Sequence, residues 1–364
     1  MSKKTLWVLV IVLAGLSAAV WWSGRRAATP AGPAAAGSGR LLPAVDLNAI
    51  RAIMLENGAS TARLAKVDGV WSVAELDGYP ADFRRLRDLL RSIDETENAQ
   101  LAEEGADHLA EYGLAVGTEP APLRIALEHD RGTTVLSLGK LREFRRTEDY
   151  WGPPAGRYVR VDEGPVQLIK EDLRGADADP AQWWDRLLLE VPRESIRKVE
   201  VGGGENSLAV ARDTNGVFAL AGGAAGEEID ASAADRLFGA LRDLRAEKIL
   251  AGETTNEAFV HAGTYVAETA GATYRIQIGA AQADQGGGRP VKIEVSGEAE
   301  AAAAKKLNGR TFLIPAYLAE PLLMKKQELV RKTEPSPDEA SETAPSAEPP
   351  PVPEDGAAAE IAEP

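Results

Sequence analysis

The feature that most constrains how this chain can fold is an internal duplication. Residues 48–98 align with residues 194–248, and apolar side chains recur at matching positions in the two copies. The matched pairs are Ile50 and Ile196, Ile53 and Val199, Leu55 and Val201, Leu64 and Val210, Trp71 and Phe218, Val73 and Leu220, Leu86 and Leu237, Leu90 and Leu241, and Ile93 and Leu244. One supersecondary unit is therefore used twice, and we expect two similar lobes.

Each copy opens with a hairpin pattern. In residues 198–201 the valines alternate with charged residues, which is the period of two expected for a strand with one solvent-facing side. The pairs Asp68-Gly69 and Asn215-Gly216 separate alternating runs, and such pairs tolerate the positive φ of tight hairpin turns. We therefore expect a strand on each side of both pairs.

An amphipathic helix is expected after the hairpin. Apolar residues recur at helical spacing through residues 83–93, with arginine and aspartate between them. These apolar residues are Phe83, Leu86, Leu90 and Ile93. Pro80 suits a first helical turn. In the second copy Asp230, which aligns with Tyr79, is a good N-cap.

The second half of each copy adds further strands. The loosely aligned pairs of segments are 125–139 with 265–279, 158–161 with 291–295, and 166–169 with 311–314. Each copy spans about 130 residues, which is long enough for a core of its own. Runs of hairpins with one covering helix belong to the α+β class. We predict two tandem lobes of mainly antiparallel strands, at residues 42–175 and 176–324.

Residues 179–190 connect the two copies. Trp183 and two following leucines would share one face of a helix in this segment. We predict a short helix that staples the first lobe to the second, with Trp183, Trp184 and Arg186 at the junction.

The N-terminus carries an uninterrupted apolar run at residues 6–22, with two lysines before it and two arginines after it. A helix of that length rises about 26 Å, slightly less than a hydrocarbon core of about 30 Å. Trp7, Trp21 and Trp22 lie at the ends of the run, as expected at the two membrane interfaces. We predict a single-pass transmembrane anchor over residues 1–23, in the inner (cytoplasmic) membrane, with the N-terminus inside and the bulk periplasmic or otherwise extracytoplasmic.

A cleaved signal peptide is the alternative for this run. It has a basic start, an apolar middle and small residues at positions 34–36. Those alanines lie well beyond the apolar run, however, and the tryptophans and arginines that follow it resemble the flank of an anchor.

Two segments contain little apolar surface to bury. Residues 24–41 are rich in alanine, proline and glycine, which is typical of a linker. Residues 325–364 are expected to form a disordered acidic tail. After Lys332 they contain mainly proline, alanine, serine and glutamate, without lysine or arginine.

The net charge of −15 and the absence of cysteine exclude several classes of function. Phosphate backbones require a basic face, so we expect no nucleic-acid partner. Without cysteine there are no disulfides, zinc–thiolate sites or cysteine nucleophiles. Acidic pairs such as Glu103-Glu104 show no calcium-loop pattern and are expected at the surface. We therefore expect no metal and no cofactor.

No catalytic motif is recognisable in the chain. The glycines at 202–204 follow an expected strand, but the lysine and the serine or threonine of a phosphate-binding loop are missing. Ser137 and Ser195 do not lie in the Gly-x-Ser-x-Gly pattern of a nucleophile elbow. We predict that the protein is not an enzyme. A hydrolase would need a converging acid–base pair that the sequence does not show.

Several short motifs together carry a resemblance to a known family. They are the apolar N-terminus, Ile50-x-x-Ile53-x-Leu55, Asp68-Gly69-x-Trp71, Tyr79-Pro80-Ala81-Asp82, Tyr112-Gly113-Leu114, and Trp184-Asp185-Arg186-x-Leu188-Leu189 after Asp179-Pro180. Over residues 5–320 or so, the chain resembles the bacterial domain of unknown function 4340 family. The resemblance implies no catalytic residues. It implies an association with ABC-type transport systems of the gliding-motility kind.

The strongest candidate for a binding surface lies within residues 142–160, where arginines and aromatic residues are concentrated. Both residue types are enriched among the anchors of protein interfaces. The candidate residues are Arg145, Arg146, Tyr150, Trp151 and Tyr158. Alternatively, the segment extends a β-hairpin, and its aromatic residues cover the end of the sheet.

These observations predict a non-enzymatic, membrane-anchored accessory protein of the cell envelope. Its duplicated lobes would form an interaction or scaffold component that docks on a membrane protein, such as the permease of an ABC-type transport system. The alternative is a periplasmic ligand- or glycan-binding module that uses a cleft between the lobes.

Overall fold

The computed structural model describes residues 40–42, 45–97, 108–117, 119–142, 156–202, 207–222, 227–250, 259–283 and 286–332. The predicted anchor at 1–23, with Trp7, Trp21 and Trp22, lies outside these ranges, and so do residues 24–39 and 333–364. Within the ranges described, no helix is long and apolar enough to span a bilayer.

The chain divides into two compact units, Met1–Trp184 and Asp185–Pro364. Both are built mainly from antiparallel strands with few helices, as the α+β prediction anticipates. The boundary falls after Trp184, whereas the sequence suggested a boundary between residues 175 and 176.

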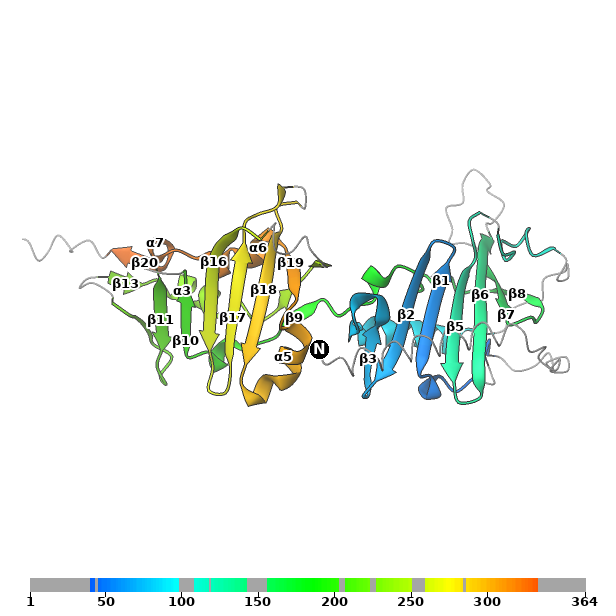
Figure 1. Cartoon of the computed structure of the whole chain (residues 1–364), viewed down its shortest axis with the longest axis horizontal. Coiled ribbons are helices and arrows are strands. Elements are labelled where there is room, and N and C mark those ends of the chain that lie inside the picture. Colours follow the sequence, from blue (N-terminus) through cyan, green and yellow to red (C-terminus); the bar gives the residue numbers. More distant parts are fainter. Residues whose placement is uncertain are drawn as a thin grey trace, which may run out of the picture. The chain divides into compact units, whose positions relative to one another are not determined.

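The first unit contains one eight-stranded sheet in the order β4-β3-β2-β1-β5-β6-β7-β8 (Figure 1). The strands are β1 (Ala52–Asn57), β2 (Ser60–Val67), β3 (Val70–Val73), β4 (Tyr79–Pro80), β5 (Leu123–His129), β6 (Gly132–Arg142), β7 (Gly156–Val161) and β8 (Val166–Ile169). Helix α2 (Phe83–Glu95) follows β4, and short 3-10 turns are η1 (Leu47–Ala49), η2 (Ala74–Leu76) and η4 (Pro180–Gln182). Leu55 and Leu64 from the sheet and Leu86 from α2 are fully buried and belong to the core.

The second unit contains another eight-stranded sheet, in the order β12-β11-β10-β16-β17-β18-β19-β15. Its strands are β10 (Lys198–Val201), β11 (Leu208–Arg212), β12 (Phe218–Leu220), β15 (Lys248–Leu250), β16 (His261–Glu268), β17 (Thr273–Gly279), β18 (Arg289–Ser296) and β19 (Thr311–Ile314). Two small ribbons pair β9 (Leu187–Leu189) with β14 (Leu244–Arg245), and β13 (Glu227–Ile229) with β20 (Val330–Lys332). The helical elements are α3 (Ala231–Phe238), α5 (Ala301–Leu307), α6 (Ala316–Ala319), α7 (Lys326–Leu329), η5 (Arg193–Ser195), η8 (Glu298–Glu300) and η9 (Pro321–Leu323).

The duplication extends to the strand register. Ile53 on β1 pairs with Leu64 on β2 and with Leu127 on β5. Val199, its predicted counterpart, pairs with Val210 on β11 and with Ala267 on β16. The two sheets therefore repeat the order β3-β2-β1-β5-β6-β7-β8 as β12-β11-β10-β16-β17-β18-β19. A strand slipped by one residue would turn its apolar side chains to the other face of the sheet. The matching registers therefore show that each unit builds its own core from equivalent positions.

The two covering helices align differently from the sequence prediction. The Asp82 carboxylate accepts a hydrogen bond from the backbone N–H of Arg85 at 3.1 Å. The Asp230 carboxylate accepts one from the backbone N–H of Ala233 at 2.9 Å. Asp230 therefore corresponds to Asp82 and not to Tyr79, which lies in β4.

This shift changes which helical residues are equivalent. Leu89 and Ile93 of α2 correspond to Leu237 and Leu241, so the predicted match of Leu86 with Leu237 is wrong by three residues. An amphipathic pattern repeats every three or four residues, and it therefore fits its own copy almost equally well after such a shift. The buried face of α2 is Leu86, Leu89 and Ile93.

The predicted helix between the copies does not form. Residues 180–182 make the single turn η4, which Asp179 caps, and residues 187–189 make strand β9. Trp183 is fully buried, and its indole N–H donates to the carbonyl oxygen of Asp177 at 2.7 Å. The Arg85 guanidinium lies 4.9 Å from the centre of the Trp183 ring. These contacts inside the first unit fix the segment in an irregular conformation.

Trp184 is also buried in the first unit, where its ring meets that of Tyr79 edge to face at a centroid distance of 5.7 Å. Arg186 lies in the second unit, and its carbonyl oxygen accepts the backbone N–H of Ala246 at 2.9 Å. A stapling role for Trp183, Trp184 and Arg186 stays a prediction.

The ends of the folded region differ from the sequence prediction. Leu41, assigned to the linker, is buried, and its backbone N–H donates to the carbonyl oxygen of Thr96 at 2.8 Å. Residues 326–332, assigned to the disordered tail, form α7 and β20. Leu329 is fully buried, and Val330 pairs with Ile229 on β13. Burial of a few apolar side chains is enough to order these short segments.

Candidate functional site

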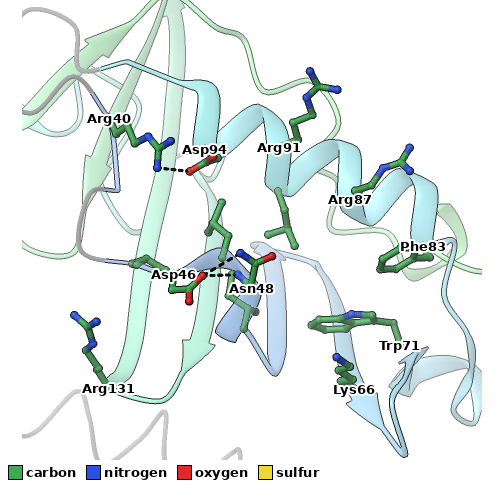
Figure 2. Close-up of a pocket in the computed structure, with 14 residues that line it drawn as sticks. Arg40, Asp46, Asn48, Lys66, Trp71, Phe83, Arg87, Arg91, Asp94 and Arg131 are labelled. Atoms are coloured by element: carbon green, nitrogen blue, oxygen red, sulfur yellow. Dashed lines mark hydrogen bonds and ion pairs between the residues drawn. The ribbon is translucent and has the colours of Figure 1, made fainter.

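A cleft of about 810 Å³ opens in the first unit beside α2 (Figure 2). Its walls come from α2, from η1 with the residues around it, and from the β2–β3 hairpin. Its volume is in the range of ligand-binding clefts. The cleft combines an apolar, partly aromatic surface with a rim of basic side chains.

The aromatic part of the cleft consists of Trp71 on β3 and Phe83 at the start of α2, and Figure 2 shows their side chains next to each other. Trp71 is 9% exposed, whereas Phe83 is 60% exposed although the sequence assigned it to the buried helix face. Leu90 on α2, also assigned to that face, is half-buried and lines the same cleft. The buried face uses Leu89 instead, so Phe83 and Leu90 are turned toward the cleft.

Five basic residues line the cleft, namely Arg40, Lys66, Arg87, Arg91 and Arg131. Arg87 and Arg91 are four residues apart on α2, and this spacing places them on one side of the helix. Lys66 is the direct cross-strand partner of Trp71 in the β2–β3 hairpin. Basic side chains from a helix, a hairpin and two loops therefore surround one aromatic surface.

Two acidic residues also line the cleft, and both are engaged by donors of the chain. Asp46 caps η1, with its carboxylate accepting from the backbone N–H of Asn48 at 2.9 Å and from the Asn48 side chain at 3.2 Å. Asp94 pairs with Arg40 at 3.3 Å. Basic residues thus outnumber acidic ones in the lining by five to two, on a chain whose net charge is −15.

The two arginines of α2 that line the cleft form ion pairs on the surface of the helix. Arg91 pairs with Glu95, four residues on, at 2.7 Å, and the hydrogen bond to Glu95 raises the pKa of Arg91. Arg87 pairs with its neighbour Asp88 at 3.2 Å. Both pairs are exposed, and exposed ion pairs contribute little, about 0–1 kcal/mol. A negatively charged ligand group would therefore compete with Asp88 and Glu95 at little cost.

The second unit uses the corresponding positions differently. Phe218 corresponds to Trp71, and Phe238 corresponds to Leu90 once the helices are aligned by their caps. The Phe218 and Phe238 rings are in contact, with centroids 5.0 Å apart. Arg212, at the position of Lys66, lies 5.8 Å from the Phe218 ring. An aromatic pair thus occupies positions that line a cleft in the first unit.

Of the five residues predicted to form a binding surface, the structure describes only Tyr158. Arg145, Arg146, Tyr150 and Trp151 lie outside the described residues. Tyr158 is on β7, and its ring packs against Tyr112 with centroids 4.6 Å apart. The binding role and the hairpin extension both remain predictions for residues 142–160.

Two ionisable groups outside the cleft have shifted pKa values and make contacts that hold the fold together. Burial lowers the pKa of Arg157, whose guanidinium contacts Asp172 at 3.3 Å. Burial raises the pKa of Tyr265, whose hydroxyl donates to the carbonyl oxygen of Leu237 at 2.9 Å and so ties β16 to α3. Across the residues that can be placed, no three histidine or acidic side chains converge as a metal site.

Two copies of one antiparallel sheet, each with a capped covering helix, define the protein as a duplicated β-sheet protein with a basic and aromatic cleft in its first unit. The chain belongs to the family of domain of unknown function 4340 (DUF4340), whose model matches residues 71–261. The match begins at Trp71 and includes the whole of α2. No curated protein and no solved structure matches the chain.

Proposed function

We propose that this protein is a non-enzymatic, membrane-anchored accessory protein of the cell envelope whose folded units bind another protein. The partner is a membrane protein, such as the permease of an ABC-type transport system. The cleft beside α2 is the observation that carries the proposal, because it concentrates arginine and aromatic side chains on an acidic protein.

The chemistry of the cleft suits a protein partner with an acidic segment. Arginine and tryptophan are enriched among the residues that dominate interface energies. Arg87 and Arg91 offer planar guanidinium groups that match carboxylates, and Trp71 and Phe83 offer apolar surface for the neighbouring residues of the segment. Basic side chains around a cleft also speed the approach of an acidic partner.

The membrane part of the proposal is supported by the sequence. Residues 6–22 are apolar and carry tryptophans at both ends, and two lysines precede the run. An anchor there would hold the duplicated units near the membrane surface, where a membrane protein is at high effective concentration.

Crosslinking in intact cells, followed by mass spectrometry, tests this function. The full chain is compared with Arg87→Glu and with Arg124→Glu, an exposed residue of β5 that does not line the cleft. We expect a specific membrane protein whose crosslinks Arg87→Glu reduces and Arg124→Glu does not. Recovery of no specific membrane protein, or equal recovery with both variants, would contradict the proposal.

The alternative is binding of a small ligand or glycan. The cleft volume of about 810 Å³ favours it, since ligand pockets span roughly 300–1,000 Å³. In this alternative the site lies within the first unit and Trp71 replaces Trp151 as the stacking surface. Binding of a glycan or a small anion that Trp71→Ala abolishes, without any protein crosslink, would favour it.

A further inference from the structure

The acidic segment 333–364 has a charge pattern opposite to that of the cleft. Within this segment there is no lysine or arginine. Its acidic residues are Glu334, Asp338, Glu339, Glu342, Glu348, Glu354, Asp355, Glu360 and Glu363. The segment directly follows β20, whose last residue is Lys332. The same chain therefore carries both a basic cleft and a strongly acidic segment.

We propose that segment 333–364 docks in the cleft beside α2 of its own chain. The inference depends on the cleft and the segment alone, and it does not require an outside partner. Carboxylates of the segment pair with Arg87, Arg91 and Lys66, and apolar residues between them cover Trp71 and Phe83.

Proline gives the segment a second feature that fits the cleft. Prolines 349–351 and Pro353 precede the acidic pair Glu354-Asp355. Proline-rich segments favour an extended polyproline conformation and dock on aromatic grooves with little further loss of entropy. Trp71 and Phe83 provide such an aromatic surface next to Arg87. The segment therefore offers prolines for the aromatic surface of the cleft and neighbouring carboxylates for its basic residues.

Tethering favours the segment of the same chain over a segment from a second copy. The 32 residues 333–364 span on the order of 100 Å when extended. A tether that reaches its site gives an effective concentration near the millimolar range, far above that of a second copy in dilute solution. Weak charge pairs therefore favour a segment of the same chain over one from a second copy.

Zero-length carbodiimide crosslinking of the purified full chain in detergent tests the docking. The reagent joins a carboxylate to a lysine amine without a spacer, and Lys66 lines the cleft. Lys170, an exposed lysine of the same unit outside the cleft, is the internal control. We expect more crosslinks from the segment to Lys66 than to Lys170.

Charge reversal supplies the matched variants. Arg87→Glu/Arg91→Glu should reduce the Lys66 crosslinks at least about fivefold, because two attractions become repulsions. Arg124→Glu/Arg242→Glu changes the net charge equally at exposed positions outside the cleft and should leave the Lys66 crosslinks unchanged. Equal yields at Lys66 and Lys170, or equal losses in both variants, would overturn the proposal.

Isotope labelling identifies the chain that supplies the segment. Heavy and light copies are mixed before crosslinking, and the Lys66 crosslinks should stay heavy–heavy or light–light. Mixed crosslinks at the statistical proportion would overturn docking within one chain. These outcomes concern the purified protein, so they are independent of whether an outside membrane partner exists.

Discussion

In the second unit the rings of Phe218 and Phe238 lie 5.0 Å apart, at the positions that Trp71 and Leu90 hold in the first unit. At these positions the second unit therefore carries two aromatic rings in contact, whereas the first unit carries a tryptophan and a leucine that line the cleft beside α2. Phe238 is 1% exposed, and its contact with Phe218 connects α3 to β12. The two copies therefore differ at these positions in a few side chains on a shared backbone plan.

Alanine substitutions should separate the two roles. Phe238→Ala should lower the free energy of unfolding by about 3–5 kcal/mol, because it leaves a cavity in the core. Phe83→Ala, the same change at an exposed cleft residue, should cost less than about 0.5 kcal/mol. Urea unfolding followed by circular dichroism measures both. A large loss for Phe83→Ala would mean that this ring belongs to the core.

The loss of fold stability at acidic pH should depend on Asp230. The hydrogen bond from the backbone N–H of Ala233 lowers the pKa of Asp230, and its ion pair with Arg331 acts in the same direction. The carboxylate therefore stabilises the fold fully above its unfolded pKa of about 4, and this contribution is lost as the pH falls through the lower pKa of the folded state.

Asp230→Asn keeps a good N-cap but removes the charge. The variant should therefore lose less stability than the unmodified protein when the pH falls from 5 to 2, as measured by thermal unfolding. The control is Asp235→Asn, an exposed change within α3. Parallel pH profiles for the unmodified protein and Asp230→Asn would contradict the assigned role of the cap.

The position of the last folded residue can be tested by truncation. A chain that ends at Lys332 keeps every described element of the second unit, because β20 ends there, and it serves as the reference for a shorter chain. A chain that ends at Met324 loses α7 and β20, and with them the fully buried Leu329 and the strand paired with β13. We expect a loss of at least about 2 kcal/mol in the free energy of unfolding. Equal stability of the two truncated chains would restore the prediction of a tail that starts at residue 325.

Local patterns predicted the strands well but the helix register poorly. The alternation around Ile53 and Val199 has a period of two, so one residue of slip reverses the buried face and the match has a single solution. The match of Leu86 with Leu237 was wrong because a helical pattern tolerates a shift of three residues. The N-cap residues Asp82 and Asp230 give the correct alignment of α2 with α3, and both can be recognised in the sequence.

The cleft lay beyond what the sequence could predict. It requires Arg40, Lys66 and Arg131, which are far apart in the chain, to meet the exposed side of α2. The local signal was the pair of arginines four residues apart on that helix. A helical pattern does not show which of Leu89 and Leu90 is buried, and this choice determines whether Phe83 faces the core or the cleft.

The loss of fold stability at alkaline pH should depend on Tyr265. Burial raises the pKa of Tyr265 above its ordinary value of about 10, because the phenolate would lose its hydration. The neutral phenol stabilises the fold fully below the unfolded pKa, and this contribution is lost as the pH rises from about 10 toward the higher pKa of the folded state. Burial also raises the pKa of Tyr274, to about 12, so both residues oppose folding at high pH.

Tyr265→Phe removes the titrating group together with the hydrogen bond to Leu237, which costs about 1 kcal/mol at neutral pH. Between pH 9 and pH 11 the variant should lose less stability than the unmodified protein, because a phenylalanine side chain has no proton to release. Urea midpoints at the two pH values measure the difference. Tyr317→Phe is the control, since Tyr317 is 67% exposed and its replacement should leave the pH dependence unchanged. If both variants followed the profile of the unmodified protein, the buried phenol would not be the group that limits stability at alkaline pH.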